Sequence, residues 1–156
     1  MLEAEIQLIK RDLGIEDLDI RIEWVDTRWL SGRDSRNQRF TGSHQRIGNY
    51  HRVRLATQQS YRELVKTLAH ELRHAWQFRE GGPAVWTEMG KVLWKGTEFA
   101  RPRVYRSEKV PYRQRPTEID AYAYQDNAWA RLFGGAAPKK VPTARERLRD
   151  MVLTAL

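Results

Sequence analysis

The sequence contains no cysteine. This absence excludes a disulfide framework, a thiolate nucleophile and a cysteine-based zinc site, so a metal centre would need histidine and carboxylate ligands. The sequence also lacks any run of about 18 apolar residues, and residues 1–14 are charged throughout, which argues against a membrane span and a secretion signal. We therefore expect a soluble, cytoplasmic protein with no membrane partner.

Acidic residues are outnumbered by basic ones. The chain has 28 Lys and Arg against 20 Asp and Glu, a net charge of +8 and a pI of about 10.0. This excess favours acidic partners, nucleic acid among them, although a well-solvated surface explains it equally. The 156 residues, 40% of them apolar, suffice for one core. Because no repeat or long linker divides the chain, we expect a single domain over residues 1–156.

The hydrophobic patterning predicts an α+β fold. Apolar residues recur at helical spacing over 2–13, where Gly14 ends the helix, and they alternate as in a strand over 18–24. Residues 27–49 have the composition of a loop with a short strand near Phe40. The remaining expected elements are a strand at 50–57, a helix over 60–78, a short helix near 84–91, a short strand near 92–95, and helices over 117–133 and 143–155. A small, mainly antiparallel sheet from residues 18–57 should pack on the two longest helices.

The motif that carries chemistry is His70-Glu71-Leu72-Arg73-His74, or H-E-x-x-H, within the helix over 60–78. A spacing of four places both imidazoles on one helix face, close enough to chelate a single ion. Glu71 between them can then reach a metal-bound water and accept its proton. Since the chain has only 4 histidines, chance explains this pattern poorly.

The position of these histidines on the helix separates two interpretations. At about 100° per residue, His70 and His74 lie opposite the apolar face and are not core histidines. They are therefore metal ligands, or they are solvent-facing residues on an exposed helix. The residues that form the apolar face are Tyr61, Leu64, Val65, Leu68, Leu72, Ala75 and Trp76.

A third metal ligand is expected from the helix over 117–133. Glu118 lies at the edge of its predicted buried face, where a carboxylate needs a partner such as a metal. The alternative is an acidic residue favoured at a helix N-terminus. Asp120 is the second choice as ligand and is more simply the capping-box partner of Thr117. Asp126 is placed near the middle of the apolar face, to orient a ligating histidine or to pair with an arginine. The predicted buried face comprises Ile119, Tyr122, Ala123, Trp129, Ala130 and Phe133.

Two segments together resemble a known group of enzymes. HELRHAWQ at 70–77 and RPTEIDAYAYQ at 115–125, with the looser W-K-G at 94–96, are similar to the small single-domain zincins of the gluzincin type. These include SprT-like and phage- or plasmid-encoded metallopeptidases, and the resemblance covers roughly residues 50–133. It implies a zincin-like fold in which His70, His74 and Glu118 bind one Zn²⁺ per chain and Glu71 is general base and acid. It also implies that an extended peptide pairs along the strand at 50–57.

The leading functional prediction is thus a zinc metallopeptidase that hydrolyses peptide bonds. Tyr105, Tyr112 or an arginine between 101 and 115 would stabilise the oxyanion. One alternative is a basic nucleic-acid-binding protein with a structural or absent zinc site, based on the arginine-rich segments 28–54 and 101–115. Another is a catalytically silent zincin scaffold. His44 and His51 are taken as surface residues, with some chance that His51 lines the cleft.

Overall fold

The computed structural model describes residues 2–26, 40–80, 85–86, 92–94, 97–99 and 112–134. Helix α1 spans Glu3–Leu13 and ends at Gly14, whose φ of 64° is the left-handed conformation that glycine adopts without strain. Strand β1 follows at Ile20–Val25. Both elements confirm the sequence-based prediction, because their apolar residues have the right period for a helix and then for a strand.

The main sheet has three strands in the order β1-β3-β2. Strands β2 (Gly42–Ile47) and β3 (Tyr50–Ala56) form an antiparallel hairpin, whose tight turn places Gly48 at a φ of 58°. Strand β1 pairs with β3 in parallel. The prediction of a mainly antiparallel sheet is therefore wrong, since one of the two pairings is parallel.

The position of β3 corrects a second expectation. Strand β3 carries the buried Val53 and Leu55 and is hydrogen-bonded on both sides, so it has no edge for a peptide. The strand beside the helices at the sheet edge is β2, within a segment predicted to be mostly loop. Its sequence, GSHQRI, lacks apolar alternation. The side chains of this strand pack against polar groups of the candidate site and not against the hydrophobic core.

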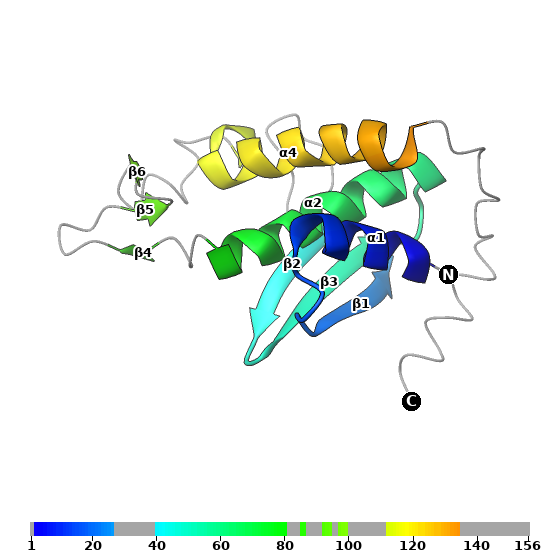
Figure 1. Ribbon diagram of the computed structural model, residues 1–156, viewed down its shortest axis with the longest axis horizontal. Coiled ribbons are helices and arrows are strands. Elements are labelled where there is room, and N and C mark those ends of the chain that lie inside the picture. Colours follow the sequence, from blue (N-terminus) through cyan, green and yellow to red (C-terminus); the bar gives the residue numbers. More distant parts are fainter. Residues whose placement is uncertain are drawn as a thin grey trace.

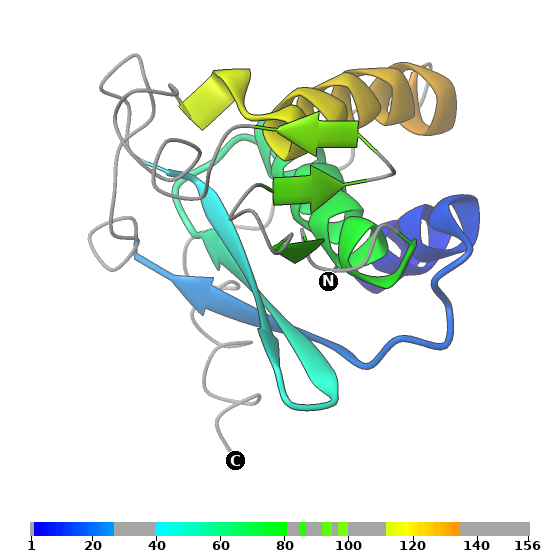
Figure 2. The same cartoon turned by 90° about the vertical axis from the view of Figure 1, so that its left-hand side faces the viewer.

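Helix α2, at Tyr61–Glu80, is the centre of the fold. Its N-terminus is a capping box, in which Ser60 N–H donates to Glu63 Oε2 (3.1 Å) and Glu63 N–H donates to Ser60 Oγ (3.3 Å). The predicted apolar face is confirmed, since Leu64, Leu68 and Leu72 are fully buried. Figures 1 and 2 show α1, α2 and α4 on one face of the main sheet, with α2 running between the sheet and α4.

Helix α4 spans Pro116–Ala128 and continues into a π-helical turn, η3, at Trp129–Phe133. A 3₁₀ turn, η2, precedes it at Tyr112–Gln114. The predicted capping box is wrong: Arg115 is the N-cap and makes no side-chain cap hydrogen bond. Proline at the first helical position needs no amide partner there, and Asp120 is occupied elsewhere, as described below.

The buried face of α4 differs from the predicted one. Glu118, Ala121 and Ala128 are buried, whereas Ile119 is 55% exposed. Ala121 and Ala128 are 0% exposed, so small side chains, rather than the larger apolar ones, occupy the buried side of α4. The π turn also shifts the helical phase, so Phe133 is buried although Ile119 is not.

Three short strands, β4 (Val85–Trp86), β5 (Val92–Trp94) and β6 (Thr97–Phe99), form a second antiparallel sheet. This confirms the strand near 92–95. It contradicts the short helix near 84–91, because Val85 and Trp86 pair with β5. The helix expected over 143–155 lies outside the described residues. In the part of the chain that the structure describes, no helix is both long and apolar enough to cross a membrane.

Candidate metal centre

Helix α2 presents His70, Glu71 and His74 on the side opposite its core face. His70 and Glu71 are nonetheless only 5% and 6% exposed, because α4 and β2 pack against this side. The interpretation as solvent-facing histidines is therefore wrong. A polar helix face is buried here, and buried polar groups need partners.

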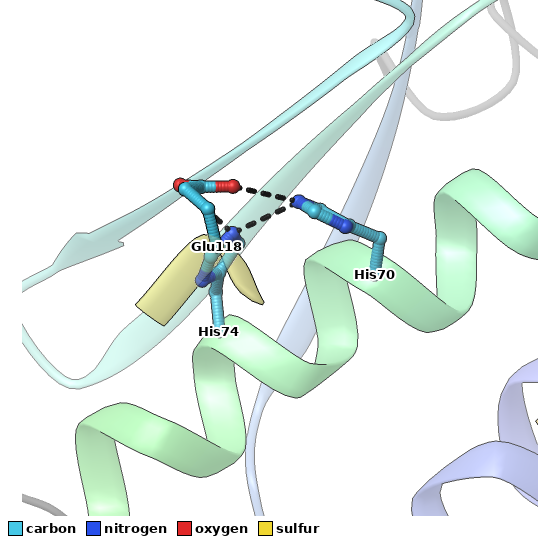
Figure 3. Close-up of side chains that lie close together, drawn as sticks. All are labelled: His70, His74 and Glu118. Atoms are coloured by element: carbon cyan, nitrogen blue, oxygen red, sulfur yellow. Dashed lines mark hydrogen bonds and ion pairs between the residues drawn. The ribbon is translucent and has the colours of Figure 1, made fainter. Parts of the chain in front are cut away.

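Glu118 of α4 supplies that partner. Its carboxylate is 7% exposed and points at both imidazoles, with Oε2 at 3.1 Å from His70 Nε2 and Oε1 at 3.5 Å from His74 Nε2. The two Nε2 atoms are 3.1 Å apart. Figure 3 shows the three side chains converging from two helices on one point. Among the described residues this is the single group of three His, Cys, Asp or Glu side chains able to hold a metal ion.

The distances within this cluster fit a metal ion. Ligand atoms about 2.0–2.1 Å from a tetrahedral zinc lie about 3.3 Å from one another. The two Nε2 atoms are 3.1 Å apart and each lies 3.1–3.5 Å from a different oxygen of Glu118, and one ligand atom from each residue lies within 4.8 Å of the others. Two nitrogens and one carboxylate oxygen are also a donor set that zinc accepts, with one position left for water or substrate.

The charges of the cluster are strongly coupled. Burial alone raises the pKa of Glu118, but hydrogen bonds from His70 and His74 outweigh it and lower that pKa to about 2. Burial lowers the pKa of His74, yet the Glu118 carboxylate, assisted by Glu71, raises it to about 9. Without a bound cation, His74 thus carries a proton at neutral pH and Glu118 remains ionised.

Glu71 faces the adjoining pocket. Burial raises the pKa of its carboxyl group above the ordinary value. The pocket has a volume of about 260 Å³ and lies between the first residues of β2, the N-terminal half of α2, η2 and α4. Glu71 and His70 line it together with Tyr112 and Tyr122. A pocket next to the ligand cluster gives a bound molecule access to the Glu71 carboxylate.

Gly42 allows β2 to pass directly over Glu71. A Cβ atom at this position would lie 2.5 Å from Thr67 Cγ2 and 2.8 Å from Glu71 Oε1, closer than real Cβ contacts. We expect Gly42→Ala to displace the Glu71 carboxylate and to destabilise the fold by about 1–3 kcal/mol through overpacking. Urea unfolding measures the loss of stability. Ser43→Ala, at the next position of β2, is the control, and unchanged stability of Gly42→Ala would contradict this contact.

Tyr105 and Tyr112 are the alternative tyrosines predicted to stabilise the oxyanion. Tyr112 lines the pocket, next to the charges of Glu118 and Glu71. Burial, followed by the charges of Glu118 and Glu71, raises the pKa of this phenol, so it stays a hydrogen-bond donor. Tyr105 lies outside the described residues.

The two remaining histidines also belong to this region, contrary to their prediction as surface residues. His51 is 5% exposed, and its Nδ1 lies 2.8 Å from His44 Nε2. The half-buried His44 ring stacks 6.3 Å from that of His74. Burial lowers the pKa of His44 to about 3, so it is neutral. Both side chains share the side of the β2–β3 hairpin that carries Val53. For His44 the sequence pattern gave no signal, because β2 was not predicted as a strand, whereas His51 alternates with Val53 and Leu55 in the predicted strand at 50–57.

The two aspartates of α4 lie away from the cluster of ligand atoms. Asp120 accepts two hydrogen bonds from Arg73, at 2.7 and 2.9 Å, and a third from Gln77 at 2.8 Å. Asp126 is 65% exposed and pairs with Lys66. Its predicted place on the apolar face is therefore wrong, and its partner is neither a histidine nor an arginine. Asp126 points outward because the buried face of α4 is rotated relative to the predicted one.

Gln77 is a site residue that sequence reasoning missed. It is 4% exposed, and its Oε1 lies 2.9 Å from His74 Nδ1. The available signal was its spacing, since a residue three positions after His74 lies on the same helix face. His70 Nδ1, in contrast, is buried without a hydrogen-bond partner among the described residues.

The described arginines of the two basic segments contact groups within the protein. Arg54 binds Glu23 at 3.0 Å, and Arg52 binds Gln45 at 2.6 Å. Arg46, Arg113 and Arg115 lie over the rings of Phe78, Tyr122 and Tyr112. The other arginines of these segments lie outside the described residues, and nucleic-acid binding stays a prediction.

Comparison of the chain with protein-family models, curated proteins and solved structures finds no match. The case for a function therefore depends on the geometry and chemistry of the site itself.

Proposed function

We propose that this protein is a zinc-dependent metallopeptidase. The observation that carries the proposal is the convergence of His70, His74 and Glu118 beside a pocket that contains the Glu71 carboxylate. These are the ligand types and the general base of the zincins that the sequence resembles. When bound, zinc would supply Lewis acidity, which activates water and polarises the peptide carbonyl.

Glu71 is the group in this site that can move a proton. Its burial raises its pKa, which makes the carboxylate a stronger base than an exposed glutamate. In the proposed reaction Glu71 takes a proton from the attacking water and returns it to the leaving amine. The scissile C–N bond breaks, the second proton of the water also passes to the nitrogen, a carboxylate and an ammonium group form, and Glu71 ends in its initial state.

The edge strand β2 is where we place an extended substrate. Among the described residues it has a partner on one side alone, β3, and it crosses α2 at Glu71. A peptide that adds to this edge gains backbone hydrogen bonds and has its carbonyls held near the ligand cluster. This replaces the strand at 50–57, which is central.

Tyr112 is the described candidate for stabilising the oxyanion. It lines the pocket beside Glu71, and its phenol keeps its proton, so it can donate to the negative charge that develops on the substrate oxygen. We expect Tyr112→Phe to lower kcat about tenfold or more, the value of one hydrogen bond to a charged group, with little change in zinc content. Unchanged steady-state kinetics of the zinc-loaded variant would exclude this role.

The test of the proposal begins with metal content. Elemental analysis of protein purified without a His tag should give about one zinc per chain, which is lost or much weakened in His74→Ala and Glu118→Ala. Asp126→Ala is the matched control, because it removes an exposed carboxylate from the same helix. The zinc-loaded protein is then incubated with an unfolded protein substrate, and new N-termini are measured with and without a chelator.

The outcomes separate the proposal from its alternatives. Chelator-sensitive cleavage by a protein with one zinc supports it. Zinc without cleavage of any unfolded substrate would indicate a catalytically silent zincin scaffold. Failure to bind zinc after reconstitution would contradict the metal site, and salt-dependent binding of DNA or RNA in a mobility-shift assay would then favour the nucleic-acid alternative.

A further inference from the structure

Gln77 joins a proposed zinc ligand to the helix that carries another. Its side chain lies in the last turns of α2 and makes three hydrogen bonds. Nε2 donates to the Thr117 carbonyl and to Asp120 Oδ2, each at 2.8 Å, while Oε1 faces His74 Nδ1 at 2.9 Å. Thr117 is the residue immediately before Glu118, so this amide spans the two halves of the ligand cluster.

The acceptors on α4 determine how the amide is oriented. A backbone carbonyl can only accept, and both oxygens of Asp120 already accept hydrogen bonds from Arg73. The NH₂ group of Gln77 must therefore face α4, which leaves Oε1, an acceptor, toward His74. His74 Nδ1 must then carry the hydrogen. As a result, the neutral imidazole has its lone pair on Nε2, the atom that faces His70 and Glu118.

We infer that Gln77 is a positioning residue for the metal site. It fixes the tautomer and ring orientation of His74 and, through Thr117, holds the first turn of α4 that presents Glu118. The inference rests on the proposed function, since it assumes that these residues bind zinc. His74 receives this support alone of the two histidines, because His70 Nδ1 has no partner among the described residues.

A purely structural role for Gln77 would be to join α2 to α4. Asp126 provides the matched control, since it bridges the same helices through Lys66 and takes no part in the hydrogen bonds of Gln77. If Gln77 only joins the helices, Gln77→Met and Asp126→Ala should affect stability and zinc affinity in the same proportion. If it positions His74, zinc affinity should fall specifically in Gln77→Met.

The experiment compares the full-length wild type, Gln77→Met and Asp126→Ala. Zinc dissociation constants come from competition with a chelator, and urea unfolding of the metal-free proteins gives their stability. We expect Gln77→Met to weaken zinc binding about 10- to 100-fold, the usual effect of removing a partner of a ligating histidine. Asp126→Ala should change it less than about threefold, because its carboxylate pairs with Lys66 outside this network. In ¹⁵N NMR spectra of the zinc-loaded protein, the protected Nδ1–H signal of His74 should be lost in Gln77→Met.

A second variant keeps the test decisive if Gln77→Met does not fold. Gln77→Glu retains an acceptor toward His74 but places two carboxylates together, and adding Asp120→Asn restores a donor opposite the new carboxylate. Zinc affinity should fall in the single variant and partly recover in the double one. Equal zinc affinity of wild type and variants would overturn the inference with the metal site intact, whereas a wild type that binds no zinc would overturn both.

Discussion

Glu71→Gln should abolish peptide hydrolysis and leave zinc bound. The amide has nearly the shape of the carboxylate but cannot accept the proton of the attacking water, so the general-base contribution of about 10²- to 10⁴-fold in kcat is lost. Glu71 is not one of the three converging ligands, and zinc content should stay near one per chain. Turnover is measured with a peptide that the wild type cleaves, and the metal by elemental analysis.

The control for this substitution is Gln125→Ala, which alters another residue that lines the same pocket without changing a charge. It should retain most of the activity. Hydrolysis at the wild-type rate by zinc-loaded Glu71→Gln would remove Glu71 from the mechanism. Loss of zinc together with activity would instead make this carboxylate part of the metal site.

Zinc affinity should rise steeply with pH, by about a hundredfold between pH 6 and pH 8. The metal-free protein holds a proton on His74 up to a pKa of about 9, because Glu118 and Glu71 outweigh the opposite effect of burial. Zinc needs the neutral imidazole, so it must displace this proton, and affinity grows about tenfold per pH unit below that pKa. Glu118, with a pKa of about 2, is ionised throughout this range and adds nothing to the slope.

Calorimetry checks this dependence directly. Zinc titrations at pH 7 in two buffers of different ionisation enthalpy should show release of about one proton from His74 for each ion bound. Asp126→Ala should release the same number, because its carboxylate pairs with Lys66 away from the site. Zinc binding without proton release would show that His74 is neutral in the metal-free protein.

Local patterns in the sequence were sufficient for the positions of α1, β1, β3, α2 and α4. The apolar residues of α2 enter the core as expected, with Leu64, Leu68 and Leu72 fully buried, whereas Ile119 of α4 is exposed. The H-E-x-x-H spacing likewise placed His70 and His74 on one face, since helical geometry fixes that relation without any tertiary contact. Glu118 could be chosen as the candidate third ligand from the sequence alone, because a carboxylate at the edge of a buried helix face needs a partner.

Other features depended on contacts between distant segments. Strand β2 has a polar sequence and forms because β3 provides backbone hydrogen bonds along one of its edges. Its polar side chains pack against the polar groups of the candidate site. The parallel pairing of β1 is equally invisible in a local pattern, because strand direction depends on how the connecting chain crosses the fold. The buried face of α4 is the one that carries Ala121 and Ala128, and Asp126 therefore points outward.

The sequence by itself therefore determined most of the elements, the histidine pair and the choice of Glu118 as the candidate third ligand, which follow from residue type and helical or strand period. Only the tertiary structure decided what surrounds them. It buried His44 and His51 next to His74 and brought Gly42 over Glu71. It also turned Gln77 into the link between His74 and Thr117. These contacts join residues from different elements, and their geometry exists only once the helices and the sheet have packed.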